Sequence, residues 1–422
     1  MNEAQIEQRT PWGLVGFLLL LHILNQIDRQ LVSAFAADIM RDLSLSRGQF
    51  GLIAGLAFSG VYAFAALMSG VLADRFGRVP VLATGVGIWS VFTALAGMAQ
   101  GFWTMLGARP FVAAGEATLV PTATNVILAR TPDRYKAAAL GLFFAGIPLG
   151  IGGGFLIAGL LGPQIGWRGT FLVMGMLGLV ALFAVTRLRD DRPVAYGNPT
   201  ILGNLAELRA VFRTNPRVLY ASLAMILVHC HVATNPFVQL WLVGEKGLEP
   251  AQAARIYGLM FVVVGLFGTF GSGLLVDLAK RRFGWDRAAT ILGMLVLLAP
   301  LLVLYRLAPP SSWLLLLGMG GSILFMTVIY GPLFAVIEEQ LPVRLKATST
   351  GFNILALNIF AVGGVAMAVG YSSEFLASIG VAQSWTWPLM GADALALLAI
   401  PLTWLAVRSQ PKAHSGLPSL SR

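Results

Sequence analysis

The sequence predicts an all-α polytopic membrane protein with twelve transmembrane helices in two six-helix bundles, and three observations support this fold class. The chain is 57% hydrophobic and 11% charged, whereas a soluble globular protein carries about 25% charged residues. Charge-free stretches such as 79–108 and 307–337 are longer than the ~20 residues that cross a bilayer. Two motifs of the first half of the chain also recur in the second half.

Twelve hydrophobic segments follow one another along the chain. Their approximate ranges are 12–34, 49–72, 80–100, 103–129, 137–161, 169–187, 218–243, 253–279, 288–305, 313–337, 347–371 and 386–407. Residues 1–10 are polar and of mixed charge, and a full-length span follows them at once, so we expect no cleavable signal. The single cysteine, Cys230, excludes an internal disulfide and a cysteine-based metal site, and we expect no cofactor.

The net charge of +10 is explained by membrane topology. If the N-terminus is cytoplasmic, 21 of the 29 lysines and arginines fall in the termini and the even-numbered connections, and six, Arg306 among them, fall in the other connections. Cytoplasmic connections of membrane proteins carry this excess of basic residues. We therefore expect an integral protein of a bacterial inner (plasma) membrane, with both termini cytoplasmic and no nucleic-acid partner.

The chain repeats itself. The connection after the fourth segment, PDRYKA at 132–137, recurs after the tenth as PVRLKA at 342–347, an offset of 210 residues. A second motif, GVLAD at 70–74, recurs as GLLVD at 273–277, an offset of 203 residues. Two matches at nearly one offset indicate an internal duplication of the kind found in transporters.

The duplication predicts four parts. They are an N-terminal six-helix bundle over 1–188, a cytoplasmic linker over 189–216, a C-terminal six-helix bundle over 217–408 and a cytoplasmic tail over 409–422. In the linker, residues 201–212 alternate apolar and charged side chains at helical spacing, which predicts an amphipathic helix on the membrane surface. A helix that binds a partner protein is the alternative.

Two spans carry small residues at i, i+4 and i+8. They are Gly51, Gly55 and Ser59 in the second span, and Gly146, Gly150 and Gly154 in the fifth. In lipid, this spacing lets helix backbones approach closely. Tight static packing explains such faces, and a smooth face on which helices slide or rock is the functional alternative. Pro148 in the fifth span favours a kink.

The connection between the second and third segments reads GVLADRFGR at 70–78. It resembles the conserved loop of the major facilitator superfamily, G-x-L-A-D-R-x-G-R, although position 79, where a second basic residue is common, is Val79. With twelve spans, two similar halves and the weaker copy at 273–277, the resemblance covers the whole chain. It implies two six-helix bundles around a central cavity that opens alternately to each side of the membrane, in a protein that works as a monomer.

The resemblance also implies a gating role for this loop. Its residues are Gly70, Asp74, Arg75, Gly77 and Arg78, with Asp277 in the second copy. By analogy, Asp74 holds the cytoplasmic side closed against the second half. Anchoring by positive charge together with a turn would account for Arg75 and Arg78 but not for Asp74.

Ionisable residues lie inside apolar spans at three places: Asp28–Arg29 in the first span, and Arg109 and Glu116 in the fourth. A charge at the bilayer centre costs on the order of 2.5–3.5 kcal/mol on insertion scales, so such residues pair or face water and mark sites that handle solutes or protons. Arg109 and Glu116 are seven residues apart, or roughly 10 Å along one helix face, so each needs another partner.

We expect Asp28 to pair with Arg109, and Arg29 either to pair with Glu116 or to extend toward water. A static ion network that only locks the helices is the alternative, although an apolar lock would cost less. In the superfamily, spans 1, 4, 7 and 10 line the cavity, and the resemblance therefore implies that these charges face it.

Four stretches narrow the resemblance. They are Asn25-Gln26-Ile27-Asp28-Arg29, Arg109 with Gly115-Glu116-Ala117, Ala145-Gly146-Ile147-Pro148-Leu149-Gly150, and Gly166-Trp167-Arg168. Together they resemble the spinster-like branch, whose members move lysolipids and sphingoid phosphates. The Asp-Arg pair and Gly-Glu-Ala are shared with organic-anion symporters, so the branch assignment rests mainly on the Ile-Pro-x-Gly stretch.

Spans 7 and 10 of the second half contain polar residues but no charge at mid-span. The polar residues are His229, His231, Asn235, Thr327 and Tyr330, and span 11 adds Asn353 and Asn358. His231 would titrate near neutral pH if wet, but a hydrogen-bonded neutral histidine is the alternative. Asp393, early in span 12, and Glu374, at a helix end, are expected to be solvated.

This asymmetry predicts the class of substrate. One cavity wall carries arginine and carboxylate, and the other is apolar and aromatic, with Phe237, Phe261, Phe267 and Phe334. An amphiphile with an anionic or zwitterionic head, such as a lysophospholipid or sphingoid phosphate, suits both walls. The predicted substrate-binding residues are Asn25, Arg29, Arg109, His231, Asn235, Tyr330 and Asn353.

Proton coupling is expected at Asp28 and Glu116, because alternating access changes the surroundings of each carboxylate and hence its affinity for a proton. The predicted function is proton-coupled secondary transport of a small amphiphile across the lipid bilayer. A proton-coupled organic-anion symporter or a multidrug exporter is the alternative within transport. An enzyme or a sensor is a further alternative, but the sequence shows neither a readable nucleophile–base pair nor an attached soluble domain.

Overall fold

The computed structural model describes residues 12–188, 201–310 and 312–409, and every regular element within these ranges is helical. The N-terminal half, residues 12–188, contains α2 (Trp12–Ala34), α3 (Ala36–Asp42), α4 (Arg47–Ala54), α5 (Leu56–Phe76), α6 (Arg78–Gly97), α7 (Phe102–Glu116), α8 (Leu119–Arg130), α9 (Asp133–Phe144) and α10 (Gly146–Val185).

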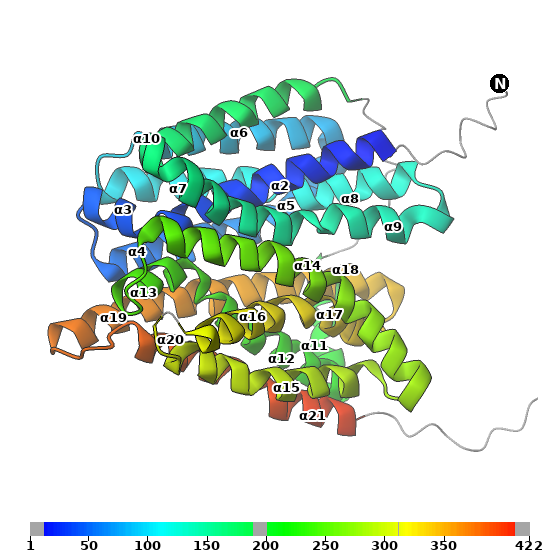
Figure 1. The fold of residues 1–422 in the computed structure, drawn as a ribbon. Helices are drawn as coiled ribbons and strands as arrows, with labels where there is room; N and C mark the ends of the chain where they lie inside the picture. The colour runs from blue at the N-terminus through cyan, green and yellow to red at the C-terminus, as the bar shows by residue number, and fades with distance from the viewer. Residues whose placement is uncertain (1–11, 189–200, 311, 410–422) are drawn as a thin grey trace, which may run out of the picture.

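The C-terminal half, residues 201–409, contains the remaining elements. They are α11 (Ile201–Thr214), α12 (Pro216–Val232), the 3-10 turn η1 (Asn235–Phe237), α13 (Val238–Gly244), α14 (Pro250–Phe283), α15 (Arg287–Leu307), α16 (Trp313–Val328), α17 (Tyr330–Glu338), α18 (Val343–Ala356), the π-helical η2 (Leu357–Val365), α19 (Ala366–Ser378), α20 (Thr386–Leu397) and α21 (Ala399–Arg408). Figure 1 shows the two halves as two groups of roughly parallel helices that meet along α10 and α14.

Within the described ranges, ten helical stretches are long and apolar enough to cross a membrane. One of them, 133–185, holds two spans, because Gly166 leaves the helical conformation in its middle (φ 67°, ψ 177°). The 23 residues of α2 are also long enough to cross, although the polar residues from Asn25 to Gln30 lower its hydropathy. With this kink and α2 counted, the described chain forms the twelve predicted spans.

The two halves meet closely at one end of the molecule, where α3, α4, α13 and α19 gather, opposite the end at which α21 lies (Figure 1); we call this the closed end. Here Ser46 Oγ and the Gly48 N–H both donate to Glu374 Oε2, at 2.9 and 2.8 Å. Arg47 donates to the hydroxyls of Ser373 and Ser384, at 2.7 and 2.8 Å. The expectation that Glu374 is solvated was therefore wrong, because its carboxylate joins the two halves.

Glycine lets the helices of the two halves touch. A Cβ added at Gly152 of α10 would lie 2.5 Å from the carbonyl oxygen of Gly258 in α14, and one at Gly258 would lie 2.7 Å from the Gly152 oxygen. The predicted small-residue faces also pack closely. Gly51 and Gly55 lie against α19 and η2 of the other half, and Gly146, Gly150 and Gly154 lie against α2.

Several spans are interrupted within their length. Span 4 breaks after Glu116, where α7 ends and α8 begins at Leu119. Span 7 breaks over 233–237, between α12 and α13. Span 11 contains the π-helical η2. Discontinuous helices in transporters expose backbone groups at the binding site, and π-helical turns are frequent at functional sites. The interruptions therefore direct attention to Glu116 and to Asn235.

The predicted amphipathic helix at 201–212 is present as α11, and its Leu208 is buried against the C-terminal half. Residues 189–200 of the predicted linker and the tail from 410 lie outside the described residues. The proposed domain boundaries and the location of α11 on the membrane surface stay predictions.

Candidate functional site

The ionisable residues of the N-terminal half come together between α2 and α7. Arg29 Nε donates to Glu116 Oε2 at 3.0 Å, which confirms one of the two arrangements expected for Arg29. Glu116 is completely buried, whereas the Arg29 side chain is 24% exposed. Of these two partners, the arginine is therefore the one that a solute can reach.

Asp28 has a different partner from the one expected. Its Oδ2 accepts a hydrogen bond of 2.5 Å from the hydroxyl of Thr93 in α6, and within the described residues it forms no ion pair with Arg109. The expected Asp28–Arg109 pair was wrong. A threonine hydroxyl on a third helix supplies the donor, and a single sequence gives no signal for a contact 65 residues away.

Arg109 is 3% exposed and stacks on an aromatic ring instead of on a carboxylate. Its guanidinium carbon lies 4.3 Å from the ring centroid of Phe58 in α5. The Arg29 guanidinium lies 5.1 Å from the same ring and 4.1 Å from that of Tyr62. Phe58 and Tyr62 stack on each other at 6.0 Å. Cation–π contacts of this kind stabilise a desolvated arginine while leaving its N–H groups available.

Each carboxylate of the cluster has one oxygen bonded and one oxygen free. Among the described residues, Asp28 Oδ1 and Glu116 Oε1 are buried and have no hydrogen-bond partner, and the same holds for Asn25 Nδ2 and Arg109 Nε. A buried, ionised carboxylate oxygen without a donor is costly, and a proton placed on it lowers that cost by removing the charge. The geometry thus leaves a position for a proton on each carboxylate.

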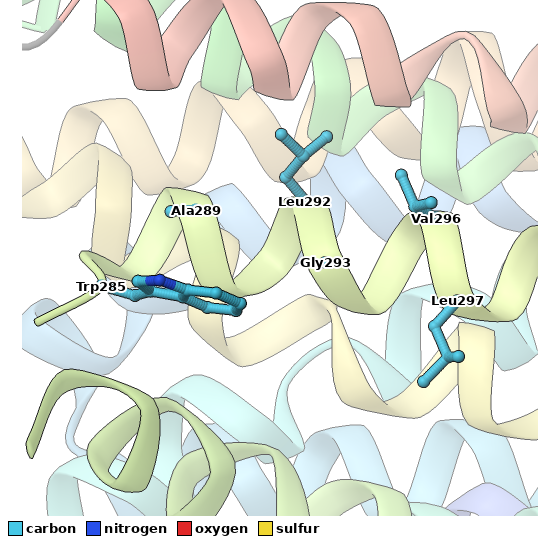
Figure 2. Close-up of a pocket in the computed structure, with 6 residues that line it drawn as sticks. All are labelled: Trp285, Ala289, Leu292, Gly293, Val296 and Leu297. Atoms are coloured by element: carbon cyan, nitrogen blue, oxygen red, sulfur yellow. The ribbon is translucent and has the colours of Figure 1, made fainter. Parts of the chain in front are cut away.

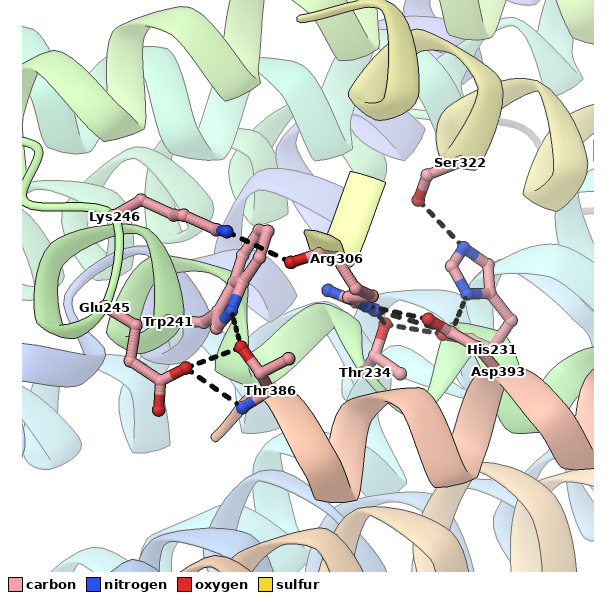
Figure 3. A network of polar contacts seen from close by, with 9 residues as sticks. All are labelled: His231, Thr234, Trp241, Glu245, Lys246, Arg306, Ser322, Thr386 and Asp393. Atoms are coloured by element: carbon pink, nitrogen blue, oxygen red, sulfur yellow. Dashed lines mark hydrogen bonds and ion pairs between the residues drawn. The ribbon is translucent and has the colours of Figure 1, made fainter. Parts of the chain in front are cut away.

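The C-terminal half contains a second ionic cluster (Figure 3). Arg306 Nε donates to Asp393 Oδ2 at 2.7 Å, and His231 Nδ1 donates to Asp393 Oδ1 at 2.6 Å. Arg306 Nη2 also donates to Thr234 Oγ1 at 3.0 Å, and His231 Nε2 lies 2.9 Å from Ser322 Oγ. Arg306 is 1% exposed and Asp393 is 5% exposed. The expectation of a solvated Asp393, and the assignment of Arg306 to a connection, were wrong.

A third polar group lies between this cluster and the closed end (Figure 3). Glu245 accepts hydrogen bonds from the backbone N–H groups of Trp385 and Thr386, at the start of α20. Lys246 donates to the backbone oxygen of Arg306 at 3.0 Å, and burial lowers the pKa of its amine. Trp241 lies within 5.1 Å of both the Lys246 and the Arg306 cations. These contacts hold the connection that follows α13 against the end of α15 and the start of α20.

Asn235, at the break in span 7, joins the two halves directly. Its Nδ2 donates to Gln30 Oε1 of α2 at 2.8 Å, and its Oδ1 accepts from the hydroxyl of Tyr257 in α14 at 2.8 Å. In this structure Asn235 is thus a bridge between the halves. On one side of this bridge, the residue before Asn235 is Thr234, which contacts Arg306. On the other side, the residue before Gln30 is Arg29.

The other predicted site residues are not gathered with the charges. Asn353 is fully buried and donates to Ser349 one turn earlier. His229 bonds the backbone oxygen of Met225. Tyr330 begins α17, but its side chain lies outside the described part of the structure. Two of the expected aromatic wall residues, Phe237 and Phe261, are buried in the core between the halves and do not form an open wall.

The loop at 70–78 makes the expected turn. Gly77 has φ 97° and ψ 153°, in the left-handed region that favours glycine, and this ends α5 before α6 begins at Arg78. Arg75 and Asp277 are exposed, and Arg78 donates to the Asn125 backbone at 3.3 Å. The Asp74 side chain lies outside the description. Its gating role stays a prediction.

An ionic contact within the N-terminal half lies at the closed end. Trp167 Nε1 and Arg168 Nη1 both donate to Asp42 Oδ2 at 2.9 Å, which ties the connection after span 5 to the end of α3. The Trp167 hydrogen bond and then Arg168 lower the pKa of Asp42. The sequence analysis named Trp167 and Arg168 as part of a family resemblance, but it did not identify Asp42 as their partner.

An apolar hollow of about 490 Å³ lies on the outer side of α15 (Figure 2). Its lining residues are Trp285, Ala289, Leu292, Gly293, Val296 and Leu297. Trp285, Val296 and Leu297 are about half or more exposed, as lipid-facing side chains are. The hollow lacks groups that would hold a charged head, and the candidate site is the charge cluster around Glu116.

The sequence model of the Major Facilitator Superfamily matches residues 18–365. The chain belongs to this superfamily. It is 26% identical to an "MFS-type efflux pump" of Mycolicibacterium smegmatis, over 94% of this chain and 93% of that protein. It is also 26% identical to "Protein spinster" of Drosophila melanogaster, over 87% of this chain and 62% of that protein.

The fold agrees with a solved structure of the same kind. A crystal structure of a bacterial homolog to the human lysosomal transporter Spinster, in an inward-facing and occupied conformation, has a TM-score of 0.81 and 22% sequence identity, and the match covers 95% of this chain and 97% of that one. The chain is thus an integral membrane transporter of the major facilitator fold and not an enzyme, and spinster proteins are among the proteins that it resembles.

Proposed function

We propose that this transporter is proton-coupled and moves an amphiphile with an anionic or zwitterionic head, such as a lysophospholipid or sphingoid phosphate. It works by alternating access in a bacterial inner membrane, as a monomer with both termini in the cytoplasm. The closed end then faces away from the cytoplasm. The observation that carries the proposal is the arrangement of Arg29 and Glu116.

The first step is protonation of the cluster. Glu116 Oε2 is held by Arg29, while Oε1 is buried without a donor among the described residues, and Asp28 shows the same division between Oδ2 and Oδ1. A proton on Glu116 removes the charge that holds Arg29. Loss of one partner from a buried pair is strongly unfavourable unless another anion replaces it. Protonation therefore favours binding of an anionic head group.

The second step is capture of the head group by Arg29. Its side chain is the part-exposed cation of the cluster, and its stacking on Tyr62 and Phe58 leaves N–H donors for a phosphate. Arg109 supports this from beneath the Phe58 ring, where it is almost completely buried. We thus assign Arg29 to direct contact with the substrate and Arg109 to the electrostatic field of the site.

The location of the site's cations in the N-terminal half alone supports an amphiphilic substrate. The cations of this site all come from α2 and α7, whereas the ionic cluster of the C-terminal half is buried within its own helices. A small dianion would be better held by cations from both halves. The resemblance to the spinster-like branch supports the same choice. An exporter of varied apolar compounds is the second candidate, favoured by the likeness to the M. smegmatis efflux pump.

Competition in purified protein separates these candidates. A labelled lysophospholipid is bound to the protein and displaced by unlabelled lysophospholipid, benzoate or a lipophilic cation. We expect displacement by the lysophospholipid alone, and a loss of binding of at least tenfold in Arg29→Gln, since a charge-assisted hydrogen bond is worth about 1.5–3 kcal/mol. Equal displacement by benzoate would favour an organic-anion symporter, and displacement by the cation would favour an exporter.

A further inference from the structure

A histidine in the C-terminal half lies between a carboxylate and a hydroxyl. His231 Nδ1 is 2.6 Å from Asp393 Oδ1, and its Nε2 is 2.9 Å from Ser322 Oγ (Figure 3). The three residues come from α12, α20 and α16, and they are separated by 162 and 91 residues in the sequence. The Asp–His–Ser order is that of hydrolase triads, but Ser322 is 3% exposed and His231 is 1% exposed. The arrangement therefore suits a proton better than a substrate.

The charges around the ring are already balanced without it. Arg306 contacts both oxygens of Asp393, at 2.7 and 3.4 Å, so this cation and this anion neutralise each other. From α16 the ring also meets the face or edge of Phe325, at 5.5 Å. Within the described residues, Asp393 is the ionisable side chain that bonds the ring, and Arg306 lies behind it. A structural lock would need only the Arg306–Asp393 pair.

The ring can gain and lose a proton without any heavy atom moving. A carboxylate only accepts, so Nδ1 carries a hydrogen in both forms. In the neutral ring, Nε2 accepts from the Ser322 hydroxyl. In the charged ring, the Nε2–H donates to Ser322 Oγ, and the serine hydrogen turns to a backbone carbonyl of the preceding helical turn. Ser322 is thus a suitable partner for both forms.

We propose that His231 is a proton-binding site of the C-terminal half, separate from Asp28 and Glu116, at which Nε2 beside Ser322 binds and releases the proton. The site is connected to the contact between the halves. Arg306 donates both to Asp393 and to Thr234. The residue after Thr234 is Asn235, which bonds Gln30 of the other half. A change of charge at His231 therefore alters an ion pair that positions this bridge.

Nitrogen NMR of the histidine rings tests the proposal, because the chain has four histidines. Full-length protein labelled with ¹⁵N-histidine is reconstituted in lipid nanodiscs, and His231→Gln identifies the His231 signals. We expect the ring to change from two protonated nitrogens to one, with Nδ1 protonated, between pH 5 and pH 9. A ring that keeps one form across this range overturns the proposal.

Two further variants make the test specific. Ser322→Ala removes the partner of Nε2 and should move the pH of the changeover by about 1 unit, the difference that one hydrogen bond to a charged group makes. Ser372→Ala, which removes an exposed hydroxyl that bonds its own helix, should leave it unchanged. An unmoved changeover in Ser322→Ala contradicts the assigned geometry.

The test is independent of the proposed coupling residues. Potentiometric titration between pH 5 and pH 9 should show that His231→Gln binds one proton fewer than the unaltered protein, whereas His229→Gln, a buried ring two residues away, should not. Asp28→Asn should retain the His231 changeover in the NMR spectrum. Loss of that changeover in Asp28→Asn would show that the two sites are one coupled unit, and would contradict a separate site.

Discussion

The contact between Gly152 and Gly258 makes a quantitative prediction about conformational balance. A Cβ at Gly152 would lie 2.5 Å from the Gly258 oxygen and 2.5 Å from Val262 Cγ2, whereas side-chain carbons keep about 3.4 Å or more from such neighbours. Two of the three atoms closest to this Cβ belong to backbone of α14 and cannot rotate away. Gly152→Ala therefore forces α10 and α14 apart by about 1 Å.

The size of the effect follows from the cost of overpacking. Inserting a methyl group into a well-packed contact costs typically about 1–3 kcal/mol. The contact exists only while the halves are packed together as they are here, so the cost falls on this conformation. The equilibrium should move away from it by a factor of about 5–150. Gly258→Ala should act in the same way from the other helix.

Pulsed electron paramagnetic resonance measures this shift. Spin labels at Arg41 in the N-terminal half and Ile379 in the C-terminal half are both exposed and lie at the closed end. The short-distance population should fall in Gly152→Ala. In the matched control Gly141→Ala, where a Cβ has nothing within 4 Å, it should not. An unchanged distribution in both Gly152→Ala and Gly258→Ala would refute the reasoning.

Three further predictions concern particular polar contacts. Asn235→Leu removes the hydrogen-bond partner of Gln30 in the other half. The ratio of short-distance to longer-distance populations of the same labels should fall by about 5–150-fold, which corresponds to about 1–3 kcal/mol; an unchanged ratio would contradict a bridge. Asp393→Asn should destabilise the protein by about 3–5 kcal/mol, because Arg306 stays buried without a counter-charge, and Asp393→Leu with Arg306→Met should recover most of the loss in thermal unfolding; a double variant as unstable as the single one would contradict this. Asp42→Asn should lower the melting temperature at pH 7, and the difference from the unaltered protein should shrink as the pH falls toward 3, because a carboxyl with a lowered folded-state pKa stabilises only above that pKa; a difference constant with pH would contradict the assignment.

The fold and the location of the first charge cluster follow from the sequence because both rest on strong local signals. Charge-free runs longer than a bilayer identify spans directly, and the cost of a buried charge singles out Asp28, Arg29, Arg109 and Glu116. The Arg29–Glu116 pair was one of two arrangements expected, and the structure confirms it. Helix spacing on one span limits which partners are possible, but it did not exclude the Asp28–Arg109 pair, which was wrong.

The partners that the sequence did not reveal lie across helix contacts or at the ends of spans. Thr93 is an ordinary threonine in an apolar span, and nothing local marks it as the donor to Asp28. Arg306 follows the predicted end of its span by one residue, so charge counting placed it in a connection, although α15 continues to Leu307. Asp393 was placed near the interface because only seven residues precede it in α20. The sequence did contain one signal for this pair, because Arg306 and Asp393 carry opposite charges.

The most direct test of the account is uptake of a labelled lysophospholipid into proteoliposomes with and without an imposed pH gradient, using the unaltered protein, Asp28→Asn and Glu116→Gln. The account predicts that the gradient drives uptake by the unaltered protein, and that the response to the gradient is lost in the two variants while binding of the label persists. Uptake that ignores the gradient, or a full response in the Asp28→Asn, Glu116→Gln double variant, would contradict coupling at these carboxylates.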